Sequence, residues 1–305
     1  MRIQIARYSE METNSKGQAL VLILLSLAVV LTLVLFILSR SITDVAVSSR
    51  EEEAVRAFSA AEAGVEQSLI VGASSGTTAI GNATYKADVS SFAAGTNGFI
   101  YPIDLNSGET STLWFVAHDA NGNILCNLGS PCFTGKQLRI CWGKPGTGAN
   151  SATTPAAELS VLYATTPGDY STVRVARAVF DPNSGRRANN SFSANDNGSC
   201  TVDGQSFAFQ KTVDLSTLGI PAASYNVQNG LQLAHLRFFY NTDTAHQAAF
   251  DVNFAGNSIL PSQGLMIDSS GIAGQSTRRL SVFQGWPEAP GVFDFALYSS
   301  SGLTK

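Results

Sequence analysis

The chain has 305 residues, of which 44% are hydrophobic and only 14% are charged. Globular domains usually carry about a quarter charged residues, so this sequence is apolar for its length. Its formal net charge of −4 argues against the broad basic surface that nucleic-acid binding requires, and no nucleic-acid partner is predicted.

The N-terminus begins with a short polar leader, residues 1–17, and continues into a long apolar run. No charged residue occurs from Gly17 to Ser39, and about 20 apolar residues suffice for a helix to cross a bilayer. A secretory signal has a shorter apolar core, about 7–15 residues, and ends at a small-residue cleavage site that is not evident here. We therefore predict a retained transmembrane segment over residues 18–39. A slight basic excess in the leader favours a cytoplasmic N-terminus.

The predicted helix continues past the membrane. Neither Gly nor Pro, the residues that most often interrupt helices, occurs between Gln18 and Ala63. After Arg40 the sequence becomes amphipathic, with apolar residues at helical spacing and charged residues on the other faces. We predict one helix over residues 18–72, whose second half packs on a globular domain through Ala54, Phe58, Ala61, Val65 and Leu69.

These features together resemble type IV pilins and pseudopilins with a class III (prepilin-type) signal. The stretch from Arg56 to Gly64 is similar to the A-x-x-A-A-E-A-G sequence of PilX-type minor pilins. The resemblance covers about residues 1–72, and it implies that a prepilin peptidase cuts between Gly17 and Gln18 and that the new N-terminus is methylated. It also implies other pilin subunits as partners. The residues implied in membrane and filament packing are Leu20, Leu22, Leu25, Val29, Leu33 and Ile37.

One position departs from the pattern of major pilins. Those proteins usually carry Glu at the fifth mature position, which is Leu22 here. The departure favours a minor or initiating subunit over the repeating major one. Two other readings stay open at this point: an uncleaved single-pass membrane protein that binds a surface ligand or glycan as an adhesin, and a plain anchor with a helical stalk.

The remaining sequence, residues 73–305, has the texture of a β-rich extracytoplasmic domain. Short β-branched and aromatic runs alternate with turn dipeptides such as Asn121-Gly122 and Asn229-Gly230. We predict mainly antiparallel sheet, with a division into two subdomains near residues 144–155. The predicted strands are Ala83–Val89, Thr112–His118, Asn123–Cys126, Gln137–Trp142, Glu158–Ala164, Thr172–Phe180, Phe207–Val213, Leu231–Tyr240, Ala248–Phe254, Arg278–Phe283 and Phe293–Tyr298.

The four cysteines all follow the apolar run, and an even number in an exported domain favours two disulfides. Four cysteines allow three connectivities, and buried thiols are the alternative. Because Cys126 and Cys132 bracket a short turn-like segment, we favour that bridge, which leaves Cys141 to pair with Cys200.

Motifs for catalysis or metal binding are weak. The G-x-S-x-G pattern at Gly72–Gly76 follows a helix, whereas a nucleophile elbow follows a strand. The histidines at 118, 235 and 246 lack metal-ligand spacing. We predict an α+β protein with a long N-terminal helix, no enzymatic activity, and no metal or cofactor. Its predicted location is the bacterial cytoplasmic membrane, in contact with lipid, and then a pilus or the cell surface.

Overall fold

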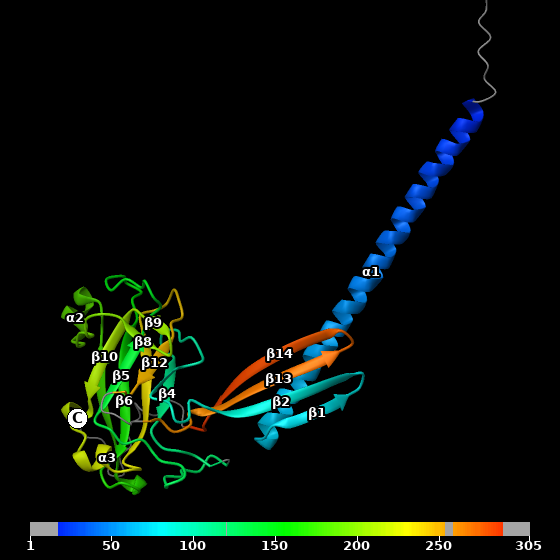
Figure 1. Ribbon diagram of the computed structural model, residues 1–305. Helices are drawn as coiled ribbons and strands as arrows, with labels where there is room; N and C mark the ends of the chain where they lie inside the picture. Colours follow the sequence, from blue (N-terminus) through cyan, green and yellow to red (C-terminus); the bar gives the residue numbers. More distant parts are fainter. Residues whose placement is uncertain (1–17, 120, 254–258, 289–305) are drawn as a thin grey trace, which may run out of the picture.

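The computed structural model describes residues 18–119, 121–253 and 259–288. A long helix, a four-stranded sheet packed on the end of that helix, and a β-sandwich follow one another in space (Figure 1). The fold is α+β, with an N-terminal helix on antiparallel β-structure, as the sequence predicted. The leader, residues 1–17, and the predicted strand Phe293–Tyr298 lie outside the described residues.

Helix α1 (Gln18–Val71) is one unbroken helix of 54 residues, roughly 80 Å long at 1.5 Å per residue. It ends where Gly72 adopts a positive φ of 68° and its N–H donates to the carbonyl of Ser68 at 2.8 Å. A glycine in this left-handed conformation is a common helix stop, because it carries no Cβ to clash. The predicted end of the helix, residue 72, is therefore confirmed to within one residue.

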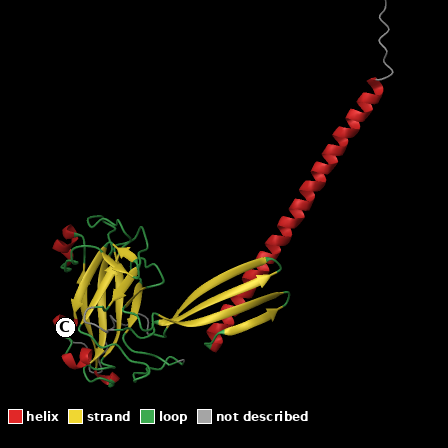
Figure 2. Ribbon diagram, in the orientation of Figure 1, coloured by secondary structure: helices red, strands yellow, loops and turns green. Residues whose placement is uncertain are grey.

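The C-terminal part of α1 packs on an antiparallel sheet of order β1-β2-β13-β14 (Figure 2). The first two strands directly follow the helix, whereas the last two come from the end of the described chain. The bounds are β1 (Ser75–Ile80), β2 (Ala83–Phe92), β13 (Gly264–Ala273) and β14 (Ser276–Gly285). Strand β13 therefore lies in the middle of the sheet, between β2 and β14.

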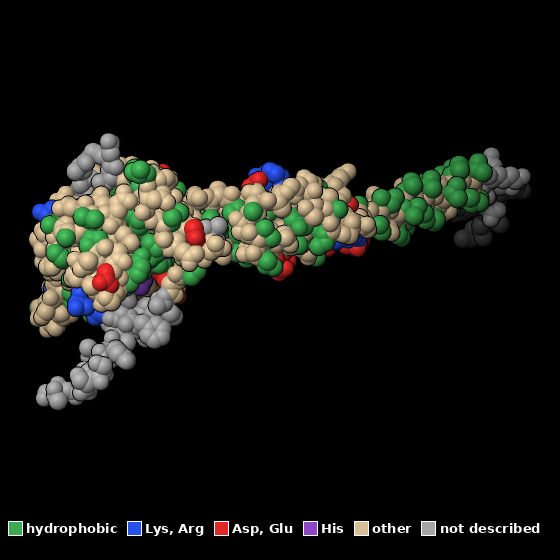
Figure 3. Space-filling view, turned by 90° about the horizontal axis from the view of Figure 1, so that it is seen from below, with side chains coloured by type: hydrophobic (Ala, Val, Ile, Leu, Met, Phe, Trp, Pro, Cys, Tyr) green, Lys and Arg blue, Asp and Glu red, His purple; other side chains and the backbone are tan. Residues whose placement is uncertain are grey.

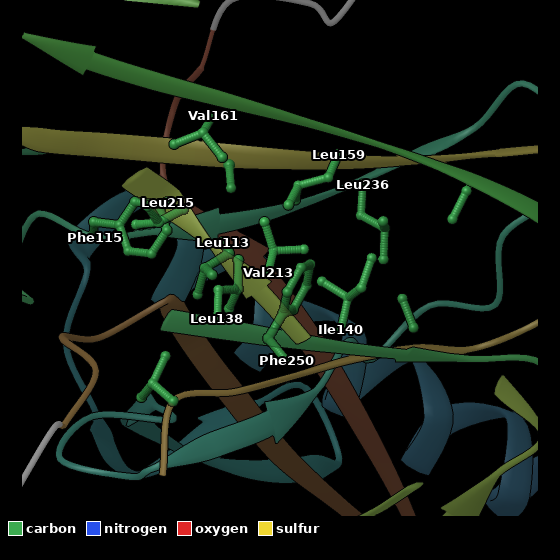
Figure 4. Packing of buried hydrophobic residues seen from close by; sticks show 14 of the residues in the cluster. Leu113, Phe115, Leu138, Ile140, Leu159, Val161, Val213, Leu215, Leu236 and Phe250 are labelled. Atoms are coloured by element: carbon green, nitrogen blue, oxygen red, sulfur yellow. The ribbon is translucent and has the colours of Figure 1, made fainter. Parts of the chain in front are cut away.

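The residues between β2 and β13 form the β-sandwich. One sheet has the order β10-β5-β12-β3 and the other the order β4-β11-β6-β7. Apolar side chains of the two sheets fill a single core, in which Leu159 and Leu236 of one sheet face Ile140 and Phe250 of the other (Figure 4). The bounds are β3 (Gly98–Ile100), β4 (Thr110–Trp114), β5 (Gln137–Trp142), β6 (Ala156–Ala164), β7 (Val173–Phe180), β10 (Phe209–Asp214), β11 (Leu231–Phe239) and β12 (Ala248–Asp251).

Shorter elements lie in the connections between the strands of the sandwich. Strands β8 (Cys200–Val202) and β9 (Gln205–Phe207) form a small hairpin, and the helical turns are α2 (Ser184–Asn190), α3 (Ala222–Asn226), η1 (Tyr170–Thr172) and η2 (Leu215–Leu218). The predicted disulfides are present: Cys126 pairs with Cys132 and Cys141 pairs with Cys200. The second bridge fastens the β8–β9 hairpin to β5.

The chain enters the sandwich after β2 and returns to the helix-packed sheet at β13. Edge-to-face aromatic contacts mark this junction, with the ring of Phe92 5.1 Å from that of Phe283 and 5.7 Å from that of Phe99. The stretch 144–155, predicted as a division between subdomains, instead connects β5 with β6, which belong to the two facing sheets of the sandwich. The chain instead passes between the helix-packed sheet and the sandwich near residues 93 and 263, because the sandwich strands lie between β2 and β13 in the sequence.

Candidate functional site: the N-terminal helix and its docking surface

The first half of α1 is an apolar rod. It is long and apolar enough to cross a membrane, and none of its most apolar window is buried. In the space-filling view this rod is covered by hydrophobic side chains (Figure 3). Gln18 is the first described residue of the helix, and Gly17 lies outside the described residues. The predicted membrane-packing side chains are all more than half exposed: Leu20, Leu22, Leu25, Val29, Leu33 and Ile37.

Two hydroxyl groups lie within the apolar rod, and the helix itself satisfies them. Ser26 Oγ donates to the carbonyl of Ile23 at 2.9 Å, and Thr32 Oγ1 donates to that of Val29 at 2.8 Å. Moving a hydroxyl group from water into hydrocarbon without a hydrogen-bond partner costs several kcal/mol. Neither of these two hydroxyl groups therefore opposes placing the rod in lipid.

The second half of α1 docks on the sheet through small residues. Ala57, Ala60, Ala61 and Gly64 are buried, and Ser68 continues the same face one turn later. These positions recur every three or four residues, so they form one stripe along the helix. The A-x-x-A-A-E-A-G sequence thus supplies the side of α1 that meets the sheet.

Small residues are needed because the two backbones come very close. A Cβ atom added to Gly271 of β13 would lie 2.5 Å from Ala61 N and closer still to Ala57 O. One added to Gly64 would lie 2.8 Å from Tyr85 Cδ2 and closer to Ser269 Oγ. Only residues with little or no side chain allow a helix and a sheet to approach to this distance.

The predicted docking stripe is correct in part. Ala61 and Val65 are buried and Ala54 is half-buried, but Phe58 and Leu69 are 42% and 38% exposed and lie at the margin. Compared with the predicted face, the buried face of α1 is rotated about the helix axis toward Ala57, Ala60 and Gly64. The prediction followed the helical spacing of apolar residues of any size, whereas the short distance between the backbones selects small ones.

A polar contact secures the end of the docking surface nearer the apolar half of α1. Glu53 accepts a hydrogen bond from the backbone N–H of Gln275 at 3.1 Å, in the turn between β13 and β14. Glu53 is half-buried there. The contact fixes the position along the helix axis at which the β13–β14 turn meets α1.

Other parts of the described chain offer little for chemistry. Ser74, within the G-x-S-x-G pattern, accepts the N–H of Val89 at 2.8 Å and so serves the sheet rather than a reaction. His118 lies between the rings of Trp114 and Trp286, at 4.5 and 5.0 Å, and burial lowers its pKa. No group of three His, Cys, Asp or Glu residues is placed to hold a metal within residues 18–119, 121–253 and 259–288.

Two hollows of similar size lie on the surface of the described residues. One of about 690 Å³ lies on the face of the β2–β13–β14 sheet and includes Lys86 and Asp88. Another of about 670 Å³ lies near β3 and the ion pair of Arg139 with Asp251. Neither collects the convergent groups that general acid–base or nucleophilic catalysis requires.

Comparison with family models, with curated proteins and with solved structures found no match for this chain.

Proposed function

We propose that this chain is a structural subunit of a type IV pilus-like filament, a minor or initiating pilin rather than the repeating one. In this proposal a prepilin peptidase removes residues 1–17, α1 stays in the cytoplasmic membrane with its N-terminus in the cytoplasm, and assembly transfers it into the core of a filament. The sandwich is then displayed outside the cell.

One observation carries the proposal: the apolar half and the docked half belong to a single unbroken helix, Gln18–Val71. An ordinary single-pass anchor needs only about 20 residues in lipid and has no need of a rigid continuation. A continuous helix fixes the distance between the membrane and the sandwich. It also presents one long apolar surface that is suited first to lipid and then to neighbouring helices.

The docking surface supports the same role. Backbones held together through Ala57, Gly64 and Gly271 make the helix and the sheet a rigid unit, and a subunit that is extracted from a membrane must transmit force along its helix. The disulfides of the sandwich, Cys126–Cys132 and Cys141–Cys200, fit an oxidising extracytoplasmic location.

The first test is processing. The full chain is co-expressed with a prepilin peptidase, and its intact mass and N-terminal sequence are read from purified membranes. We expect a chain beginning at Gln18 with an added methyl group. A Gly17→Val variant should keep its leader, whereas the control Gly76→Ala, which changes an exposed glycine of β1, should be processed normally.

Two other results would overturn the proposal. A chain that retains Met1 in the presence of active peptidase would identify an uncleaved membrane-anchored binding protein. A chain that begins beyond Ser39 would mean that the apolar run is a secretory signal.

A further inference from the structure

One face of the β4–β11–β6–β7 sheet is turned away from the core of the sandwich. Ala234 and Leu236 of β11 belong to the core, so His235 between them points to the opposite face. In the register of the sheet, His235 lies beside Thr112 of β4 and Ser160 of β6. We call the side of the sheet that carries Thr112, Ser160 and His235 the outer face.

The outer face is buried although many of its side chains are polar. Thr112, Ser160 and His235 are only 7%, 3% and 5% exposed, and Glu158, on the same face of β6, is 7% exposed. On a sheet face that meets water, polar side chains of this kind remain accessible. The outer face of this sheet is therefore covered.

The last described residues begin this cover. Trp286 packs beside Trp114 at the end of β4. Two residues later, Glu288 accepts a hydrogen bond from Thr112 Oγ1 at 2.8 Å and lies 3.5 Å from His235 Nε2. The chain therefore runs over the outer face in the direction opposite to β4.

The cover extends past Glu288. The strand register places Arg237, the next outward position of β11 after His235, beside Glu158 of β6. Glu158 lies one strand beyond the two that Glu288 touches, yet it is as deeply buried as Thr112. What covers Glu158 and Ser160 must therefore reach further across the sheet than Glu288 does.

The sequence that follows Glu288 suits this position. Within residues 289–305, Phe293, Phe295 and Leu297 alternate with Asp294 and Ala296, so an extended segment would carry its large apolar side chains on one side. At about 3.3 Å per residue and about 4.8 Å between strands, these residues can span the whole sheet. We call residues 289–305 the tail.

We propose that the tail docks on the outer face of its own chain, with Phe293, Phe295 and Leu297 toward the sheet. The tail is the favoured occupant because it starts at Glu288, which is already in place, so its effective concentration at this surface is high. A second copy or a separate protein would first have to displace it.

The docked tail ties the sandwich to the helix-packed sheet. The chain passes between these two units near residues 93 and 263, and the segment from β14 to Glu288 makes a third connection. Trp286 strengthens this connection, since its Nε1 donates to the carbonyl of Ser262 at 2.9 Å and its ring lies 5.0 Å from that of His118. The tail thereby fixes how the sandwich is oriented on α1, whether or not the chain enters a filament.

Histidine modification tests the proposal in the full chain in detergent micelles. Diethyl pyrocarbonate modifies accessible imidazole groups, and mass spectrometry of peptides reads each histidine separately. In a variant that ends at Glu288, His235 should be modified several times faster than in the full chain. His246 is also 5% exposed, but it accepts the backbone N–H of Lys144 elsewhere in the sandwich, so its rate should stay unchanged and report that the domain is folded.

Two point variants of the full chain decide the matter if truncation unfolds the sandwich and exposes both histidines. Phe295→Asp places a charge on the side of the tail that meets the sheet, and it should speed modification of His235. Ala296→Asp is the matched control, because it adds the same charge at the next position, on the other side of an extended segment. It should leave His235 protected.

Three results would overturn the inference. His235 could be equally protected without the tail, or Phe295→Asp and Ala296→Asp could have the same effect. Protection of His235 in the full chain that falls on dilution would assign the outer face to a second copy. Cleavage after Gly17 is read separately by intact mass, so none of these results bears on the proposed filament role.

Discussion

Replacing Gly271 by alanine should separate the helix from its sheet. The added methyl group would lie 2.5 Å from Ala61 N, whereas ordinary van der Waals contact begins at 3.4 Å, so the backbones must part by about 0.9 Å there. Ala57 O is closer still and demands a larger shift. Both neighbouring atoms belong to the backbone of a continuous helix, which cannot rotate out of the way as a side chain can.

The energetic cost follows from two opposing effects. Forcing a methyl group into a packed interface costs about 1–3 kcal/mol, and the rigid neighbours place this site at the upper end. Alanine returns about 0.5–1 kcal/mol because glycine is a poor residue within a strand. The net loss should be about 2 kcal/mol in the stability of the helix–sheet unit.

Hydrogen–deuterium exchange on the full chain in detergent micelles measures this loss locally. A loss of about 2 kcal/mol should speed exchange of the β13 and β14 amides about thirtyfold. Peptides from the sandwich should be unchanged. The matched control is Gly76→Ala, since a Cβ at Gly76 has no neighbour within 4 Å. Equal exchange of β13 in the two variants would refute the claim that close backbone contact holds the helix to the sheet.

Three further predictions concern other parts of the molecule. Gly64→Ala should destabilise the helix–sheet unit by only about 1 kcal/mol, because helix propensity offsets part of the clash, and adding Ser269→Ala, which removes the nearer of the two obstructing side chains, should restore part of the stability in the same exchange assay, since Tyr85 stays in place. Removing the Cys141–Cys200 bridge, whose cysteines are 59 residues apart, should lower the sandwich's free energy of unfolding by about 4 kcal/mol in urea titrations of the oxidised protein. Burial lowers the pKa of His118, and nearby Asp119 opposes the shift. The neutral His118 side chain therefore stabilises the fold fully above the unfolded pKa of about 6.5, and this stability is lost as pH falls through the folded pKa. His118→Phe should therefore lose less stability than the wild type between pH 7 and pH 5, and an unchanged pH dependence would contradict this account.

Features that depend on local sequence were predictable. The apolar run and the absence of Gly and Pro define α1, and the turn dipeptides adopt the positive φ expected of them, for example 80° at Gly122 and 61° at Asn229. The predicted strands Glu158–Ala164 and Thr172–Phe180 are confirmed as β6 and β7, which pair as neighbours. The short segment between Cys126 and Cys132 made that disulfide the natural first choice, and the structure contains it.

Features that depend on long-range packing were missed. Strand β13, which lies against α1 and carries Gly271, was not predicted, because its Ser-Ser-Gly sequence is typical of a loop. Those small residues are present because the helix approaches so closely. For the same reason the prediction placed Phe58 in the docking stripe, whereas the structure buries the neighbouring alanines. The distance between two backbones cannot be read from either segment alone.

The proposed assembly role is tested most directly by asking where the mature chain is found. Cells of a strain that assembles type IV filaments would express this chain with an epitope tag on the sandwich, and surface filaments would be sheared off and purified away from membranes. We predict that the filaments contain the tagged chain and that its N-terminus is Gln18. A chain that remains wholly in the membrane fraction, while filaments are recovered in normal amounts, would contradict the account.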